Sequence, residues 1–142
     1  MSQLAHEPSV VIVTENGQGR YQQAVEAGRH RLIADEPESM GGGNAGPAPF
    51  DYLLTALGAC TSMTLRMYAE LKKLPLTQVR VALRHQKIEV DGQKIDLISR
   101  DITLEGELTP EQRQRMLEIA NRCPVHRTIS GGQLRIESQL SA

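Results

Sequence analysis

Two residues of the chain can do thiol chemistry, Cys60 and Cys123. Cys60 lies in the stretch "DYLLTALGACTSMTLRMYAEL" (51–71), where nearly every neighbour is apolar or small. A cysteine reacts as its thiolate, and apolar surroundings raise the pKa of a thiol. Free cysteine is also among the most buried residue types. The residues around Cys60 alone therefore favour a small, inert core side chain.

Cys123 lies in a different context, "NRCPVHRT" (121–128), after a predicted helix and before Pro124. If Pro124 opens a new helical turn, Cys123 occupies its N-cap position, where unpaired backbone N–H groups favour a thiolate. His126 and Arg127 are close in sequence and would add positive charge. Both a reactive and an inert Cys123 fit these features.

Other site chemistries find less support in the sequence. Cys123 and His126 have the spacing of a metal-ligand pair, but a zinc site needs three or four ligands. Cys60, His30 and His85 would have to complete it, and nothing in their spacing indicates that, so we expect no metal and no other cofactor. No serine stands on a recognisable nucleophile turn. "GGGNAG" (41–46) lacks the Lys-Ser/Thr ending of a phosphate loop.

Length and composition predict one soluble domain spanning residues 1–142, with residues 1–8 flexible. The net charge is −1 without a long run of one sign, so we expect no nucleic acid partner. No apolar run reaches the roughly 18 residues of a membrane span, and the N-terminus lacks a secretory signal, so a cytoplasmic protein without a membrane partner is expected. Aromatic residues make up only 3%, and part of the core could come from a partner subunit.

Hydrophobic periodicity predicts an α+β fold of the order β-β-β-α-β-β-α-β. The apolar residues of the long helix point in nearly all directions over its first half, which is typical of a helix buried on several sides. The predicted elements are a strand over 9–14, two strands within 20–37 around Ala27-Gly28, a Gly- and Pro-rich connector over 38–50, a helix over 50–73, strands over 79–90 and 95–108 joined by the turn 91–94, a capped helix over 109–122 and a last strand over 131–140.

Two long segments of the chain together resemble one known family. "DEPESMGGGNAGPAPFDYLLTALGACTSMTLRMYAE" (35–70) resembles its Gly- and Pro-rich connector and buried, cysteine-bearing helix. "LTPEQRQRMLEIANRCPVHRTI" (108–129) resembles its second helix and second cysteine. The family is OsmC/Ohr, the osmotically inducible and organic hydroperoxide resistance proteins, and the match is closest to the OsmC-like branch. The resemblance implies an OsmC-like fold and an intertwined homodimer in which each protomer helps to build its partner's core.

The resemblance also implies a chemistry for both cysteines. In the family they meet near the dimer interface and reduce organic hydroperoxides. Cys60 thiolate would attack the peroxide and become a sulfenic acid, and Cys123 would then form a disulfide with it and release water. An external dithiol would reset the pair by exchange. The alternative is a small-molecule-binding or redox-sensing OsmC-like protein without significant turnover.

Two further site residues follow from the resemblance, Arg20 and Asp51. The Ohr branch uses an arginine from the early strands, and Arg20 falls near that position, where a guanidinium would stabilise the thiolate. A surface strand residue fits Arg20 equally well. The branch also uses a glutamate at the start of the central helix, where this chain has Phe50 followed by Asp51. Asp51 would either orient Arg20 or, as the residues favour slightly, serve the helix dipole.

Overall fold

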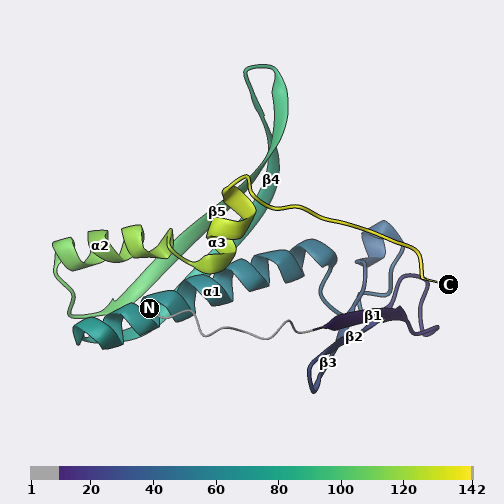
Figure 1. The fold of residues 1–142 in the computed structure, drawn as a ribbon, viewed down its shortest axis with the longest axis horizontal. Coiled ribbons are helices and arrows are strands. Elements are labelled where there is room, and N and C mark those ends of the chain that lie inside the picture. The colour runs from purple at the N-terminus through teal and green to yellow at the C-terminus, as the bar shows by residue number, and fades with distance from the viewer. Residues whose placement is uncertain (1–9, 142) are drawn as a thin grey trace. The chain divides into compact units, whose positions relative to one another are not determined.

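The computed structural model describes residues 10–141 and divides the chain into two compact units between Leu53 and Leu54. The predicted flexible stretch 1–8 lies outside the described residues. Hairpins and helices together confirm the α+β prediction. The elements are β1 (Val11–Glu15), β2 (Gln23–Ala27), β3 (His30–Ala34), the 3-10 helix η1 (Glu38–Met40), α1 (Pro49–Lys72), β4 (Leu76–Val90), β5 (Gln93–Gly106), α2 (Pro110–Ala120) and α3 (Pro124–Ser130) (Figure 1).

The first unit contains an antiparallel meander of the strands β1, β2 and β3. Val25 in the middle of β2 pairs with Val13 on one side and Leu32 on the other. The turn between β2 and β3 begins at Gly28, which has φ +60°, a conformation that glycine adopts without a steric penalty. The predicted turn at Ala27-Gly28 is therefore confirmed.

Asp35 organises the Gly-rich connector that leads to α1. Its side chain is 3% exposed and accepts hydrogen bonds from the backbone N–H groups of Glu36 at 2.8 Å, Gly43 at 3.2 Å and Ala45 at 3.0 Å. These donors, above all Ala45, lower the pKa of the Asp35 carboxyl against the opposing effect of burial. The connector is thus an ordered loop around an ionised carboxylate.

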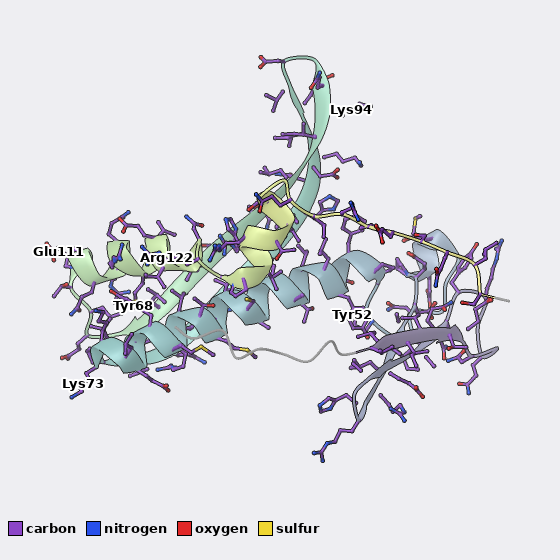
Figure 2. All side chains as sticks on the ribbon, viewed as in Figure 1. Tyr52, Tyr68, Lys73, Lys94, Glu111 and Arg122 are labelled. Carbon is purple, nitrogen blue, oxygen red and sulfur yellow. The ribbon has the colours of Figure 1, made fainter. Side chains whose placement is uncertain are left out.

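The second unit is built on the long antiparallel hairpin of β4 and β5. Its turn, Asp91-Gly92, connects the pair Val90 and Gln93, and both turn residues have positive φ, 49° and 77°. This is the type I′ geometry whose twist matches that of the flanking strands. Figure 2 shows Lys94 near the hairpin tip, beyond the helices α1 and α2.

The helices α1 and α2 pack against the base of this hairpin. Gly58 of α1 makes room for Leu83 of β4, since a Cβ atom at position 58 would lie 2.6 Å from Leu83 Cδ1. Thr109 caps α2 through a reciprocal capping box with Gln112, as the sequence predicts for a helix starting at this threonine. The core consists of Leu65, Ala69, Leu76, Leu108, Met116, Ile119 and Ala120.

The structure differs from the sequence prediction after Cys123. The segment 124–130 forms the short helix α3, and the strand expected over 131–140 is not formed. Leu134 and Ile136 of this segment are 57% and 81% exposed. The alternation of apolar and polar residues in this segment is typical of a strand. A strand must pair with a neighbouring strand, however, and no described strand pairs with this segment.

One face of α1 is buried and the opposite face carries exposed apolar side chains. Met63, Met67 and Leu71 follow each other at four-residue spacing and are 60%, 55% and 69% exposed. We call these three residues the α1 stripe. Among the described residues, no helix has both the length and the apolar character that crossing a membrane requires.

The core predicts a large stability effect at Met116, which has no exposed surface. Met116→Ala removes most of this side chain and leaves a cavity, so the free energy of unfolding should fall by about 2–5 kcal/mol in urea denaturation. Leu117→Ala is the matched control, because Leu117 lies on the same helix and is 52% exposed. This substitution should lower the free energy of unfolding by less than about half as much as Met116→Ala does. Equal losses in both variants would contradict this core assignment.

Candidate functional site

The structure brings Cys60 and Cys123 into contact. Cys60 lies in the middle of α1, where its thiol is half-buried, and the Cys123 thiol is its side-chain hydrogen-bond partner. The Cys60 sulfur also receives hydrogen bonds from the Val125 backbone N–H and the Thr64 side chain. Two residues remote in sequence therefore share one site, although both are free thiols here.

The pKa of Cys60 is raised, first by burial and then by the neighbouring Cys123 thiol. The N–H of Val125 and the side chain of Thr64 oppose this rise, because hydrogen bonds to a sulfur stabilise its charged form. The raising effects outweigh the lowering ones. Cys60 is therefore predominantly a thiol at neutral pH, and its reactivity should increase as the pH rises.

Pro124 opens the helix α3, and Cys123 is its N-cap residue. This confirms the cap that the sequence predicted for the case that Pro124 starts a helical turn. Its sulfur is fully buried and accepts a hydrogen bond from the His126 backbone N–H at 3.5 Å. One of the unpaired donors at the start of α3 is thereby satisfied by sulfur.

Arg100 of β5 joins the segments around both thiols. Its Nη1 donates to Thr61 Oγ1 at 2.9 Å and to the Ala120 carbonyl at 3.2 Å. Its Nη2 donates to Asn121 Oδ1 at 2.8 Å and lies 3.2 Å from His126 Nδ1. A single half-buried guanidinium therefore contacts α1, the end of α2 and α3.

The positive charge at this site comes from Arg100, and His126 adds none near neutral pH. Burial and the charge of Arg100 lower the pKa of His126, so its ring is neutral and Nδ1 accepts from the guanidinium. Within the described residues, no carboxylate forms an ion pair with Arg100. The guanidinium charge is met there by neutral acceptors.

The sequence reasoning missed Arg100, although β5 carries a signal for it. The half-buried positions Ile98, Arg100, Ile102 and Leu104 alternate with exposed ones, so an arginine interrupts an otherwise apolar inward-facing row. A charged side chain in such a row needs partners, and functional sites are one place where they are found. The partners themselves follow only from the packing of three helices.

Arg20 and Asp51 belong to the first unit. The guanidinium carbon of Arg20 lies 4.9 Å from the centre of the Tyr21 ring, in cation–π geometry. Asp51 Oδ2 accepts a hydrogen bond from the Ala48 backbone N–H at 3.1 Å, just before α1 begins. This contact fits the helix-terminal role of Asp51, and the roles of both residues in thiol chemistry stay predictions.

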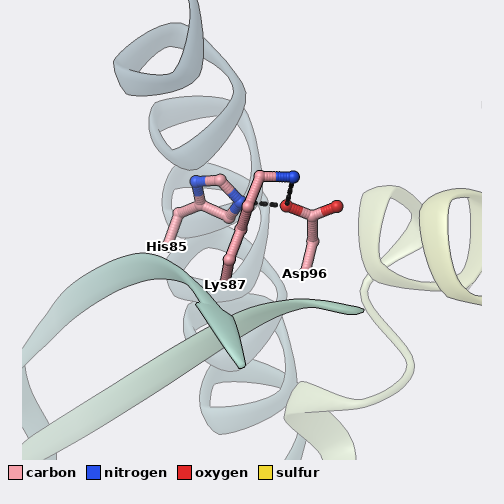
Figure 3. A network of polar contacts seen from close by, with 3 residues as sticks. All are labelled: His85, Lys87 and Asp96. Atoms are coloured by element: carbon pink, nitrogen blue, oxygen red, sulfur yellow. Dashed lines mark hydrogen bonds and ion pairs between the residues drawn. The ribbon is translucent and has the colours of Figure 1, made fainter. Parts of the chain in front are cut away.

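His85, one of the histidines considered as metal ligands, lies beside a carboxylate and a lysine. His85 Nε2 lies 2.8 Å from Asp96 Oδ1, which also pairs with Lys87 Nζ at 3.3 Å on the hairpin (Figure 3). Hydrogen bonds from His85 and then Lys87 lower the pKa of the Asp96 carboxyl. In residues 10–141, no three His, Cys, Asp or Glu side chains are grouped as a metal ion would require.

An open groove of about 440 Å³ lies between β5 and α2. It contains neither cysteine, so we base the candidate site on the thiols and Arg100. The residues that line this groove are Ile102, Leu104, Pro110, Arg113, Gln114 and Leu117.

The class of protein follows from comparison with known families. The sequence profile of OsmC-like proteins matches residues 41–139, which include both cysteines and Arg100. This span is well over half of the chain, so the chain belongs to the OsmC-like family. No curated protein matches it.

Solved structures share the fold at low sequence identity. An OsmC-like protein from Mycoplasma pneumoniae has a TM-score of 0.74 at 17% identity, with 89% of each chain covered. The organic hydroperoxide resistance protein OsmC from Legionella pneumophila has a TM-score of 0.69 at 18% identity, covering 89% of this chain and 92% of that one. An organic hydroperoxide resistance protein from Elizabethkingia anophelis has a TM-score of 0.68 at 18% identity, covering 92% and 93%. The predicted OsmC-like fold is thereby confirmed.

The hydrogen bond from Thr64 predicts a measurable shift in Cys60 reactivity. Thr64→Val removes a contact that lowers the Cys60 pKa, so the curve of iodoacetamide alkylation against pH should move to higher pH. One neutral hydrogen bond corresponds to a fall of about three- to tenfold in alkylation rate near neutral pH. The rate is followed by mass spectrometry of the Cys60 peptide.

Thr103→Val is the matched control for this experiment, because it makes the same chemical change at an exposed position of β5. Its alkylation curve should coincide with that of the unchanged protein. Superimposable curves for Thr64→Val and the control would contradict the assigned hydrogen bond.

Proposed function

We propose that this OsmC-like protein is a thiol-dependent peroxidase that reduces organic hydroperoxides through Cys60 and Cys123. The observation that carries the proposal is the contact between the two thiols. Family membership supports it, and several structural neighbours are named organic hydroperoxide resistance proteins.

The proposed cycle begins at Cys60. Its thiolate attacks the terminal peroxide oxygen, the O–O bond breaks, and the leaving alkoxide takes up a proton to become an alcohol. Cys60 has then become a sulfenic acid. The two electrons that reduce the peroxide come from the Cys60 sulfur.

Cys123 completes the reaction because its sulfur already touches that of Cys60. Its thiolate attacks the Cys60 sulfenic sulfur, a disulfide bond forms, and the displaced hydroxide leaves as water after protonation. An external dithiol reduces the disulfide by exchange and is itself oxidised. The assignment of Cys123 to this step is favoured by its full burial, which makes it less accessible to a peroxide than the half-buried Cys60.

The apolar environment of Cys60 fits an organic rather than an inorganic peroxide. It raises the thiol pKa and so keeps the resting thiolate population low. The apolar side chains that flank Cys60 in the sequence would bind the hydrocarbon part of a substrate through the hydrophobic effect.

The test is consumption of cumene hydroperoxide in the presence of a dithiol. The unchanged protein should turn over, and Cys60→Ser should fall to the rate of the reductant alone. Cys123→Ser should lose the intramolecular disulfide while its Cys60 sulfenic acid becomes trappable by dimedone. Peptide mass spectrometry after stoichiometric peroxide should find a disulfide between residues 60 and 123 in the unchanged protein.

Two experimental results would contradict the proposed peroxidase activity. Equal slow rates for the unchanged protein and Cys60→Ser would exclude a peroxidase that depends on Cys60. A 60–123 disulfide that forms stoichiometrically without turnover would instead favour the redox-sensing alternative.

A homodimer is the second part of the proposal. The α1 stripe of Met63, Met67 and Leu71 exposes apolar surface at helical spacing, which a second copy of the chain would cover. The resemblance to the family leads to the same expectation, a core completed by the partner protomer.

Placing a charge in the α1 stripe should separate the protomers. We expect the unchanged protein to sediment at twice the mass of one chain, and Met67→Glu to sediment as a single chain, because a carboxylate at such an interface would lose its hydration. Lys72→Glu is the control, since Lys72 is exposed in the last turn of the same helix. A dimer that persists in Met67→Glu would place the interface elsewhere.

A further inference from the structure

We propose that Arg100 is a positioning residue for the Cys60–Cys123 disulfide, because it joins the three segments that hold the two sulfurs. This inference rests on the proposed thiol chemistry and goes beyond it by naming the side chain that aligns the pair. The role is assigned from contacts around both thiols.

On the Cys60 side, Arg100 contacts the next residue of α1. Thr61 has no exposed surface, and its hydroxyl donates to the Leu57 carbonyl at 2.7 Å while accepting from Arg100 at 2.9 Å. The hydroxyl is thus used in both directions, and its position is fixed. Through it, the guanidinium is attached to the turn of α1 that carries Cys60.

On the Cys123 side, Arg100 and Cys123 share an acceptor. The Ala120 carbonyl, among the last of α2, accepts from the Cys123 backbone N–H at 3.3 Å and from Arg100 at 3.2 Å. A cation at the carboxyl end of a helix is also favourable for the helix dipole. Arg100 Nη2 also donates to Asn121 Oδ1 at 2.8 Å, on the segment that leads to Cys123.

The third residue held by Arg100 is His126, which contacts Arg100 and Cys123 at the same time. Its ring accepts from Arg100 at 3.2 Å, and its backbone N–H donates to the Cys123 sulfur at 3.5 Å. Arg100 therefore holds the residue that in turn orients the sulfur of Cys123.

The planar guanidinium suits this task because its donors have fixed directions. Disulfide formation requires Cβ atoms about 3.5–4.5 Å apart with a defined dihedral angle. Holding two reacting groups in the right geometry raises their effective concentration. The equilibrium constant for an intramolecular disulfide increases with that effective concentration. A side chain that holds α1, α2 and α3 together thus controls how readily the two sulfurs bond.

The test measures this alignment without any peroxide. The reduced protein is equilibrated with mixtures of oxidised and reduced glutathione, and the 60–123 disulfide is quantified by mass spectrometry. Two protein thiols give two electrons and two protons to oxidised glutathione, which leaves as two reduced molecules. In Arg100→Met, we expect the equilibrium constant for the disulfide to fall at least about tenfold.

Two control variants separate positioning from charge and from general stability. Arg100→Lys keeps the charge but lacks the fork of donors, so it should not restore the equilibrium constant. Arg113→Met removes a guanidinium that donates to the Leu104 and Gly106 carbonyls at 2.8 and 3.0 Å, away from both thiols. It should change the melting temperature and leave the equilibrium constant as in the unchanged protein.

The outcomes distinguish this inference from the proposed function. Equal equilibrium constants for the unchanged protein, Arg100→Met and Arg100→Lys would overturn the positioning role alone, as would full restoration by lysine. A lowered constant in both Arg100 variants supports it even if the unchanged protein consumes no peroxide, a result that would overturn only the peroxidase. A protein in which no 60–123 disulfide forms would overturn both.

Discussion

The contact between the two thiols depends on how α1 and α2 pack against the β4–β5 hairpin. Leu65 of α1 and Met116 of α2 belong to one buried core, which fixes both helices on the same strands. Cys60 lies little more than a turn before Leu65, and Cys123 closely follows the end of α2. Since protein interiors are close-packed, the helices cannot slide without opening voids. The meeting of the sulfurs is therefore a result of core packing in the second unit.

This packing has an electrostatic cost at Cys60. The environment that holds the two sulfurs together also raises the pKa of the Cys60 thiol, and the Cys123 thiol contributes to that rise. Thr64 and the N–H of Val125 recover part of the loss by hydrogen bonding to the sulfur. Alignment and ionisation thus oppose each other here, and the charge of Arg100, which contacts neutral acceptors within residues 10–141, lies where three segments meet around the thiols.

Features with a local cause could be predicted from the sequence. The Asp91-Gly92 turn and the cap at Cys123 each depend on a few adjacent residues, and both are formed. The role of Arg100 could not be deduced, because its partners come from three helices whose approach is decided by tertiary packing. The segment 131–140 has a strand pattern but no strand, since propensity is local and pairing is not. Local composition favoured an inert Cys60. Only the family resemblance predicted a redox role for the two cysteines.

The contact between Arg100 and His126 depends on the pH of the solution. A guanidinium can only donate, so His126 Nδ1 must be without a proton, and the single proton of the neutral ring resides on Nε2. The lowered pKa of His126 preserves this tautomer until the solution becomes more acidic than an ordinary imidazole would require. Below that point the ring gains a second N–H, which faces the N–H groups of Arg100, and attraction becomes repulsion. Acid would then loosen the cap of α3 while Cys60, whose pKa is raised, stays a thiol.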